Sequence, residues 1–158
     1  MISIIYVNFF TQNLIIDSIN SLLLKCASAL SSEIIISNNG GDLDRVKSKF
    51  PFVIILENNE NLGFGKANNM AVNISTGDFI FLLNPDTIIM DNCLDTFLSF
   101  YRMNHVKLNI GVLGGEIFDV NGNHNFSSNY HANVYNDIKY ILAGLLSYLV
   151  AKTKKKRV

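Results

Sequence analysis

The chain has 158 residues, of which 49% are apolar and 16% are charged, so it is expected to form a globular domain with a sizeable core, and a disordered chain is excluded. Basic and acidic residues balance at thirteen each, but five of the basic residues lie within residues 152–158. The rest of the chain has eight basic and thirteen acidic residues, a net charge of −5. This acidic body excludes nucleic acid as the main partner, because phosphate contacts need a basic face.

Strand-like and helix-like segments alternate along the first hundred residues, which is typical of a largely parallel sheet with helices on both faces. Apolar runs predict strands at 2–7, 34–36, 52–56 and 79–83. Helical spacing predicts helices from 14 to near 31, at 43–50, at 64–74, and from an Asp91 cap through 101. The first strand begins directly after Met1 with no secretory-type leader, so we expect a cytoplasmic protein.

The alternation of strand-like and helix-like segments is less clear beyond residue 104. Short strands are expected at 110–113 and 116–120, and Asn121-Gly122 is a hairpin-type turn pair. A dense apolar segment at 138–151 runs into the basic tail and is too short to cross a bilayer comfortably. It could lie on a membrane surface, pack on its own domain or an oligomer partner, or begin a longer span. We expect a domain at 1–125 and a C-terminal extension at 126–158.

The two cysteines, Cys26 and Cys93, lie far apart in the sequence and show no metal-binding spacing. We interpret them as core thiols of a reducing compartment.

A carboxylate follows the fourth expected strand. The apolar run 79–83 is typical of a parallel strand covered on both faces, and Pro85 cannot continue its ladder. Asp86 is therefore expected at the carboxyl edge of the sheet, where ligands bind in open α/β sheets. With the amide of Asn84 and the hydroxyl of Thr87 beside it, Asp86 suits a divalent cation that carries phosphate oxygens. This predicts a nucleotide diphosphate site; the alternative for Asp86 is a simple turn cap.

Several motifs follow one another in a fixed order. They are Ile-Ile-Tyr-Val-Asn at 4–8, Glu-Ile-Ile-Ile-Ser-Asn-Asn at 33–39, Asn-Leu-Gly-Phe at 61–64 with Asn69, and Leu-Asn-Pro-Asp-Thr at 83–87. Gly-Val-Leu-Gly-Gly at 111–115 and Asp-Val-Asn-Gly at 119–122 come after them. Together these motifs resemble the family 2 glycosyltransferases, and most closely the rhamnosyltransferase-like branch of bacterial polysaccharide synthesis.

The resemblance implies an α/β GT-A fold, Rossmann-like and mostly parallel, and inverting transfer of a sugar from a nucleotide-diphosphate donor to a glycan or lipid-linked acceptor. Asp86 would close the family's Asp-x-Asp motif, which begins here with Asn84, and would hold Mn²⁺ or Mg²⁺. Asn38 stands where the family has the aspartate that recognises the base; an ordinary Asx turn is the alternative for Asn38 and Asn39. The implied donor-binding residues are Tyr6, Val7, Asn8, Asn38, Asn39, Gly63, Phe64, Asn69, Asn84 and Asp86.

The family's general base, part of a Glu-Asp element, has no counterpart, since no Glu-Asp pair occurs in the sequence. The chain resembles the donor-binding half of such an enzyme. Three functions compete: a glycosyltransferase domain, a non-catalytic nucleotide-sugar-binding module that needs a partner chain, and a nucleotidyltransferase. The third lacks support, because no Gly-rich basic loop follows the first strand.

Overall fold

The computed structural model describes residues 1–125 and divides the chain into two compact units, Met1–Gly111 and Val112–Val158. In chain order the first unit contains β1 (Ile2–Asn8), α1 (Gln12–Lys25), the 3₁₀ turn η1 (Ala27–Ser31), β2 (Glu33–Asn38), α2 (Asp44–Lys49), β3 (Ile54–Glu57), α3 (Phe64–Ile74), β4 (Phe79–Leu82) and α4 (Cys93–Leu108). The described part of the second unit contains β5 (Ile117–Phe118) and β6 (His124–Asn125). The predicted boundary at residue 125 stays a prediction.

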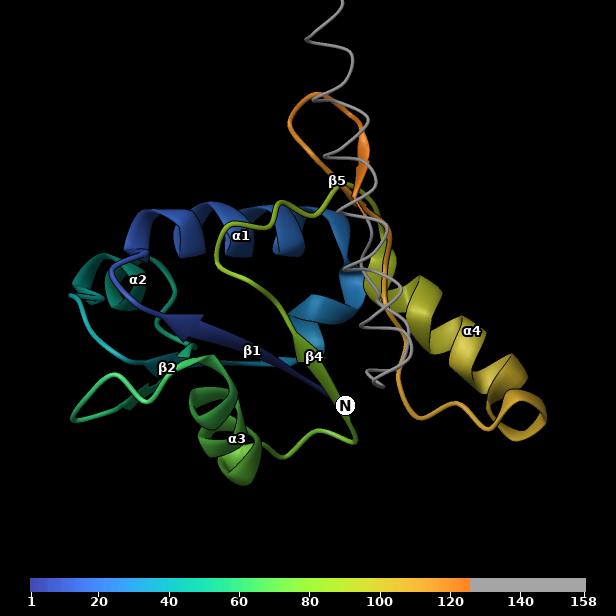
Figure 1. Ribbon diagram of the computed structural model, residues 1–158, viewed down its shortest axis with the longest axis horizontal. Coiled ribbons are helices and arrows are strands. Elements are labelled where there is room, and N and C mark those ends of the chain that lie inside the picture. The colour runs from blue at the N-terminus through green and yellow to red at the C-terminus, as the bar shows by residue number, and fades with distance from the viewer. Residues whose placement is uncertain (126–158) are drawn as a thin grey trace, which may run out of the picture. The chain divides into compact units, whose positions relative to one another are not determined.

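The four strands of the first unit form a parallel sheet in the order β3-β2-β1-β4. Helix α1 lies on one face and α3 on the other (Figure 1). The expected α/β architecture is therefore confirmed. The last residues of three neighbouring strands stand in register, with Asn8 opposite Asn38 and Asn38 opposite Glu57. This register sets a row of polar side chains at the carboxyl edge of the sheet.

Alternating residues of β1 and β2 supply the core on the two faces. Ile4 and Ile36 belong to the larger cluster, which includes residues of α1, α2 and α4. Ile5 and Ile35 pack against Ala71 of α3. Tyr6 is fully buried on the larger side, where its hydroxyl lies 3.2 Å from the Ser18 hydroxyl and burial raises the pKa of the phenol. Both central strands are thus covered on both faces.

Strand β4 is covered on one face only, so the prediction that 79–83 is buried on both faces is wrong. Phe79 packs edge to face on Tyr101, with ring centroids 5.1 Å apart, on the side of the larger cluster. On the other side Ile80 is 39% exposed and Leu82 is 50% exposed. This side of β4 is exposed because the helix on that face, α3, packs against β1 and β2.

Several other predicted elements differ from those of the structure. The predicted helix at 14–31 is interrupted at Cys26, where the backbone is extended (φ −114°, ψ 107°) between α1 and η1. Helix α4 begins after Asn92, which takes the cap position expected for Asp91, and continues to Leu108. Residues 110–113 form no strand. The Asn121-Gly122 turn does join a hairpin, in which the Gly122 N–H donates to the Asp119 carbonyl at 3.0 Å.

The two cysteines are close in space despite their separation in sequence. Cys26 is buried and Cys93 is half-buried, their sulfurs lie 3.9 Å apart, and both thiols are free. Burial, followed by the Cys26 sulfur beside it, raises the pKa of Cys93 to about 12. A thiol with such a pKa stays protonated at neutral pH and is a poor nucleophile.

The connection from α3 to β4 passes close to the amino end of the central strands. The Gly77 N–H donates to the Ser3 hydroxyl at 2.8 Å and to Glu33 Oε1 at 3.1 Å. Ser3 and the Thr76 N–H also donate to the Glu33 carboxylate. Desolvation alone would raise the pKa of Glu33, but these hydrogen bonds together outweigh it and lower the pKa. The turn is therefore attached to both β1 and β2.

Within residues 1–125 no helix combines the length and hydrophobicity that crossing a bilayer requires. The apolar segment 138–151 and the basic tail 152–158 lie outside the described residues.

Candidate functional site

The row of polar residues at the carboxyl edge is joined by hydrogen bonds across three strands. Asn8 Nδ2 donates to Asn38 Oδ1 at 2.7 Å, and Asn38 Nδ2 donates to Glu57 Oε2 at 2.7 Å. Asn8 also organises the β1–α1 loop, because its Oδ1 accepts hydrogen bonds from the N–H and the hydroxyl of Thr11 at 3.0 and 2.9 Å. The structure thus brings together two predicted site residues, Asn8 and Asn38. Glu57 is a third member that the sequence analysis missed.

A second set of amide contacts ties β2 to the loop before α3. Asn39 Oδ1 accepts hydrogen bonds from Asn58 Nδ2 at 3.0 Å and from the Leu62 N–H at 3.3 Å. Asn39 Nδ2 donates to the Gly63 carbonyl at 3.3 Å. Gly63 has φ +72°, a conformation that favours glycine, and none of the described protein atoms lies within 4 Å of a Cβ built there. Asn39 and Gly63 therefore shape one loop, and space beside Gly63 is open.

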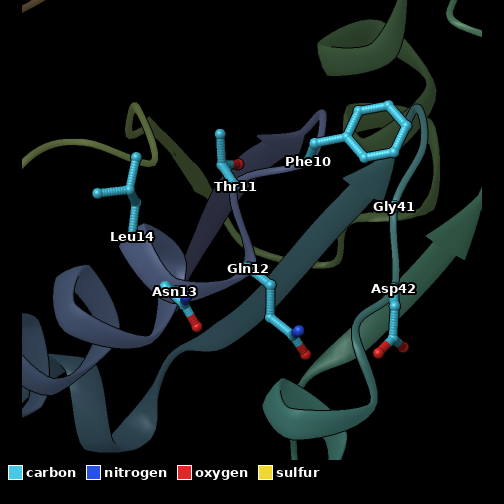
Figure 2. Close-up of a pocket in the computed structure, with 7 residues that line it drawn as sticks. All are labelled: Phe10, Thr11, Gln12, Asn13, Leu14, Gly41 and Asp42. Carbon is cyan, nitrogen blue, oxygen red and sulfur yellow. The ribbon is translucent and has the colours of Figure 1, made fainter.

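The β1–α1 loop, the first turn of α1 and the β2–α2 loop line an open pocket of about 520 Å³ on this edge. Figure 2 shows Thr11, Asn13 and Leu14 on one side of it and Gly41 with Asp42 on the other, and the Phe10 ring lies beside Gly41. The loops approach closely: the Phe10 N–H donates to the Gly40 carbonyl at 3.0 Å, and a Cβ at Gly41 would lie 3.1 Å from Phe10 Cα. Gly41 is thus favoured over other residues both by this approach and by its φ of +94°.

An aromatic pair projects from the first loop. Phe10 has φ +57°, uncommon for a residue other than glycine, and its side chain is 73% exposed. Its ring packs edge to face on the exposed Phe9 ring, with centroids 4.8 Å apart. Two exposed aromatic rings at the carboxyl edge of the sheet are suited to stacking on a flat ligand. The sequence analysis did not include this pair in the site, although two consecutive phenylalanines directly after the first strand could have indicated it.

Asp86 lies in the tight turn that ends β4. The Leu83 N–H still donates to the Ile5 carbonyl at 3.0 Å, and the Thr87 N–H donates to the Asn84 carbonyl at 3.1 Å. Asn84 and Asp86 are exposed. Residues 1–125 contain no cluster of three or more His, Cys, Asp or Glu side chains that could hold a metal. A cation at this turn would therefore need oxygens from its ligand in addition to Asp86, which is a donor set that Mg²⁺ and Mn²⁺ accept.

The other predicted donor-binding residues are distributed along the same elements. The side chains of Tyr6 and Val7 are buried, so these residues could offer only their backbone. Phe64 and Asn69 are exposed on α3. The assignment of all ten residues to a donor site stays a prediction.

The sequence profile described as glycosyl transferase family 2 matches residues 3–150. No curated protein matches the sequence. Among solved structures, S. aureus TarS 1-349 is similar with a TM-score of 0.59 and 20% identity over 66% of this chain. A mannosyltransferase from Pyrobaculum calidifontis, in complex with GDP-Man and Mn²⁺, has a TM-score of 0.57 and 15% identity over 63% of this chain.

The chain spans about a third of the length of these relatives, 33% of TarS 1-349 and 32% of the mannosyltransferase. TarS 1-349 has also been solved in complex with UDP-GlcNAc. The similarity confirms the expected GT-A fold.

Proposed function

The chain belongs to glycosyl transferase family 2, and we propose that it binds a nucleotide-diphosphate sugar at the carboxyl edge of its sheet, for inverting transfer to a glycan or lipid-linked acceptor in polysaccharide synthesis. The observation that carries the proposal is the polar row of Asn8, Asn38 and Glu57 beside the loops that enclose the pocket. Ligands of open α/β sheets bind at this edge. Within the family, the motifs resemble the rhamnosyltransferase-like branch most closely.

The proposed site divides into a part for the nucleoside and a part for the diphosphate. The backbone of Tyr6 to Phe9, the Asn39 amide and the open space beside Gly63 would receive the nucleoside. Asp86, assisted by Asn84, would hold Mn²⁺ or Mg²⁺. Such a cation would neutralise the diphosphate oxygens, which would otherwise meet an acidic protein body.

A ligand that binds only the folded state stabilises it by mass action, by about 2.7 kcal/mol at a concentration of 100 Kd, and so raises the melting temperature. We expect nucleotide diphosphates and their sugars to raise the melting temperature of the 158-residue chain, with a larger shift when Mn²⁺ is present. The measurement is a thermal-shift panel with and without Mn²⁺, with the matching nucleosides as controls. The proposal fails if no nucleotide diphosphate or nucleotide sugar shifts the transition under either condition.

A non-catalytic nucleotide-sugar-binding module that works with a partner chain is the second candidate. It is favoured by the lack of a recognisable Glu-Asp base in the sequence, because transfer needs a base within about 3 Å of the acceptor hydroxyl. Incubation of the purified chain with Mn²⁺, donors and membrane-extracted acceptors separates the two. Transfer that depends on Asp86 favours the enzyme, and donor binding without transfer favours the module.

We also propose that residues 138–158 attach the protein to the inner face of the membrane, where lipid-linked acceptors reside. The apolar segment precedes five cations, each worth about 1 kcal/mol near an anionic surface. We expect flotation with anionic liposomes that weakens as salt rises and is lost on deletion of 152–158, whereas neutral liposomes serve as the control. Flotation that does not change with salt, or that is equal after deletion of 152–158, would contradict membrane attachment.

A further inference from the structure

The side chain of Asn38 has no hydrogen-bonding capacity left for a ligand. Its Oδ1 accepts from Asn8 Nδ2 at 2.7 Å and from the Gly40 N–H at 3.1 Å. Its Nδ2 donates to Glu57 Oε2 at 2.7 Å and to the Gly41 carbonyl at 3.1 Å. These four bonds are all that one amide can make, and the residue is only 5% exposed. Asn38 therefore holds the β2–α2 loop and orients its neighbours.

Glu57, by contrast, keeps free acceptor capacity on the same edge. Its side chain is 57% exposed, and Lys47 Nζ lies 3.8 Å from Oε1. A carboxylate offers about four acceptor positions, and the contacts with Asn38 and Lys47 occupy two of them. The hydrogen bond from Asn38 fixes one oxygen in place. The hydrogen-bonded row of Asn8, Asn38 and Glu57 thus ends in an accessible carboxylate, with the Lys47 ammonium beside it.

The order of these groups matches one kind of nucleobase edge. Guanine presents two adjacent N–H donors, on N1 and N2, and beside them the acceptor O6. The N1–H and N2–H groups lie side by side, so they can donate to the two oxygens of one carboxylate in a bidentate pair. In that arrangement O6 would face the Lys47 ammonium. Uracil presents a single N–H between two carbonyl oxygens, one of which would oppose the carboxylate. Adenine would direct its N1 lone pair at the carboxylate, which is repulsive.

We propose that Glu57, supported by Asn38 and flanked by Lys47, is the base-recognising residue of this chain, and that the base is guanine. The inference rests on the proposed nucleotide-sugar site and names the donor class for it, a guanosine diphosphate sugar. Asn38 becomes a positioning residue: it carries the hydrogen-bond network from Asn8 to the carboxylate, and Glu57 supplies the charge that strengthens hydrogen bonds to the base.

Calorimetric titration of the full chain with GDP, UDP, dTDP and ADP in the presence of Mn²⁺ tests the inference. The variant is Glu57→Gln, which keeps an oxygen for Asn38 but removes the charge. The matched control is Glu60→Gln, another exposed glutamate in the loop that follows β3. We expect the wild type to bind GDP most tightly, Glu57→Gln to weaken GDP about tenfold or more, and Glu60→Gln to stay within about twofold of the wild type.

The melting temperature of each variant without ligand shows whether the fold is preserved, and the expected result for both is a value near that of the wild type. Tightest binding of UDP, dTDP or ADP, or equal GDP affinity in Glu57→Gln, would overturn the assignment of guanine to Glu57 while the nucleotide site itself stands. If none of the four nucleotides binds the wild type, the site and the inference fail together.

Discussion

Asp86→Ala is expected to abolish the Mn²⁺-dependent part of nucleotide diphosphate binding and to leave the fold intact. Asp86 is the carboxylate of the turn that ends β4, and residues 1–125 hold no cluster of carboxylates, histidines or cysteines that could take its place. Loss of a residue that merely orients a metal ligand costs about 10–100-fold in affinity, so loss of the ligand itself should cost more than about 100-fold. The measurement is titration with a nucleotide diphosphate, with and without Mn²⁺.

Two variants serve as references for this result. Asp91→Ala removes another exposed carboxylate from the same β4–α4 connection and is expected to bind like the wild type. Asn84→Ala should weaken binding by about 1 kcal/mol, the contribution of a neutral hydrogen bond. The exposure of Asp86 predicts an unchanged melting temperature without ligand. An Asp86→Ala protein that keeps its Mn²⁺-dependent affinity would refute the role of Asp86.

The parallel sheet could be predicted from the sequence because the alternation of strands and helices depends on the chemistry of neighbouring residues. Strands β1 and β2 are apolar runs flanked by polar loops, α3 has the expected bounds Phe64–Ile74, and Pro85 ends β4 as a residue that cannot donate to the ladder. Asn8 and Asn38 could be placed on the same edge because parallel strands end together. These features need no knowledge of how the elements pack.

Features that depend on the packing of distant segments could not be predicted in the same way. An apolar run is read as buried on both faces, whereas the exposure of Leu82 depends on where α3 lies. Likewise, the contact of Glu57 with Asn38 depends on the register of β3 against β2, and that of Cys26 with Cys93 on the packing of α4 near the end of α1. The candidate base-recognising carboxylate was missed for this reason.

Gly77→Ala is expected to destabilise the domain severely, because the turn before β4 lies against the backbone of β1. A Cβ at this position would lie 2.6 Å from the Ser3 backbone nitrogen and 2.8 Å from the Ile2 carbonyl carbon, and it would also meet the Ser3 hydroxyl. Backbone atoms of a central strand cannot move aside as a flexible side chain can. The turn must shift instead, which breaks the hydrogen bonds from the Gly77 N–H to Ser3 and Glu33.

We expect Gly77→Ala to lower the free energy of unfolding by roughly 3–5 kcal/mol, the sum of an overpacking penalty and the lost hydrogen bonds. The matched control is Gly65→Ala in α3, where none of the described atoms lies within 4 Å of the new Cβ and alanine is the better helix former by about 1 kcal/mol. Urea denaturation followed by circular dichroism should therefore show opposite shifts for the two variants. A Gly77→Ala protein within about 1 kcal/mol of the wild type would show that the turn can leave β1 at little cost, so that the close approach does not hold β4 in the sheet.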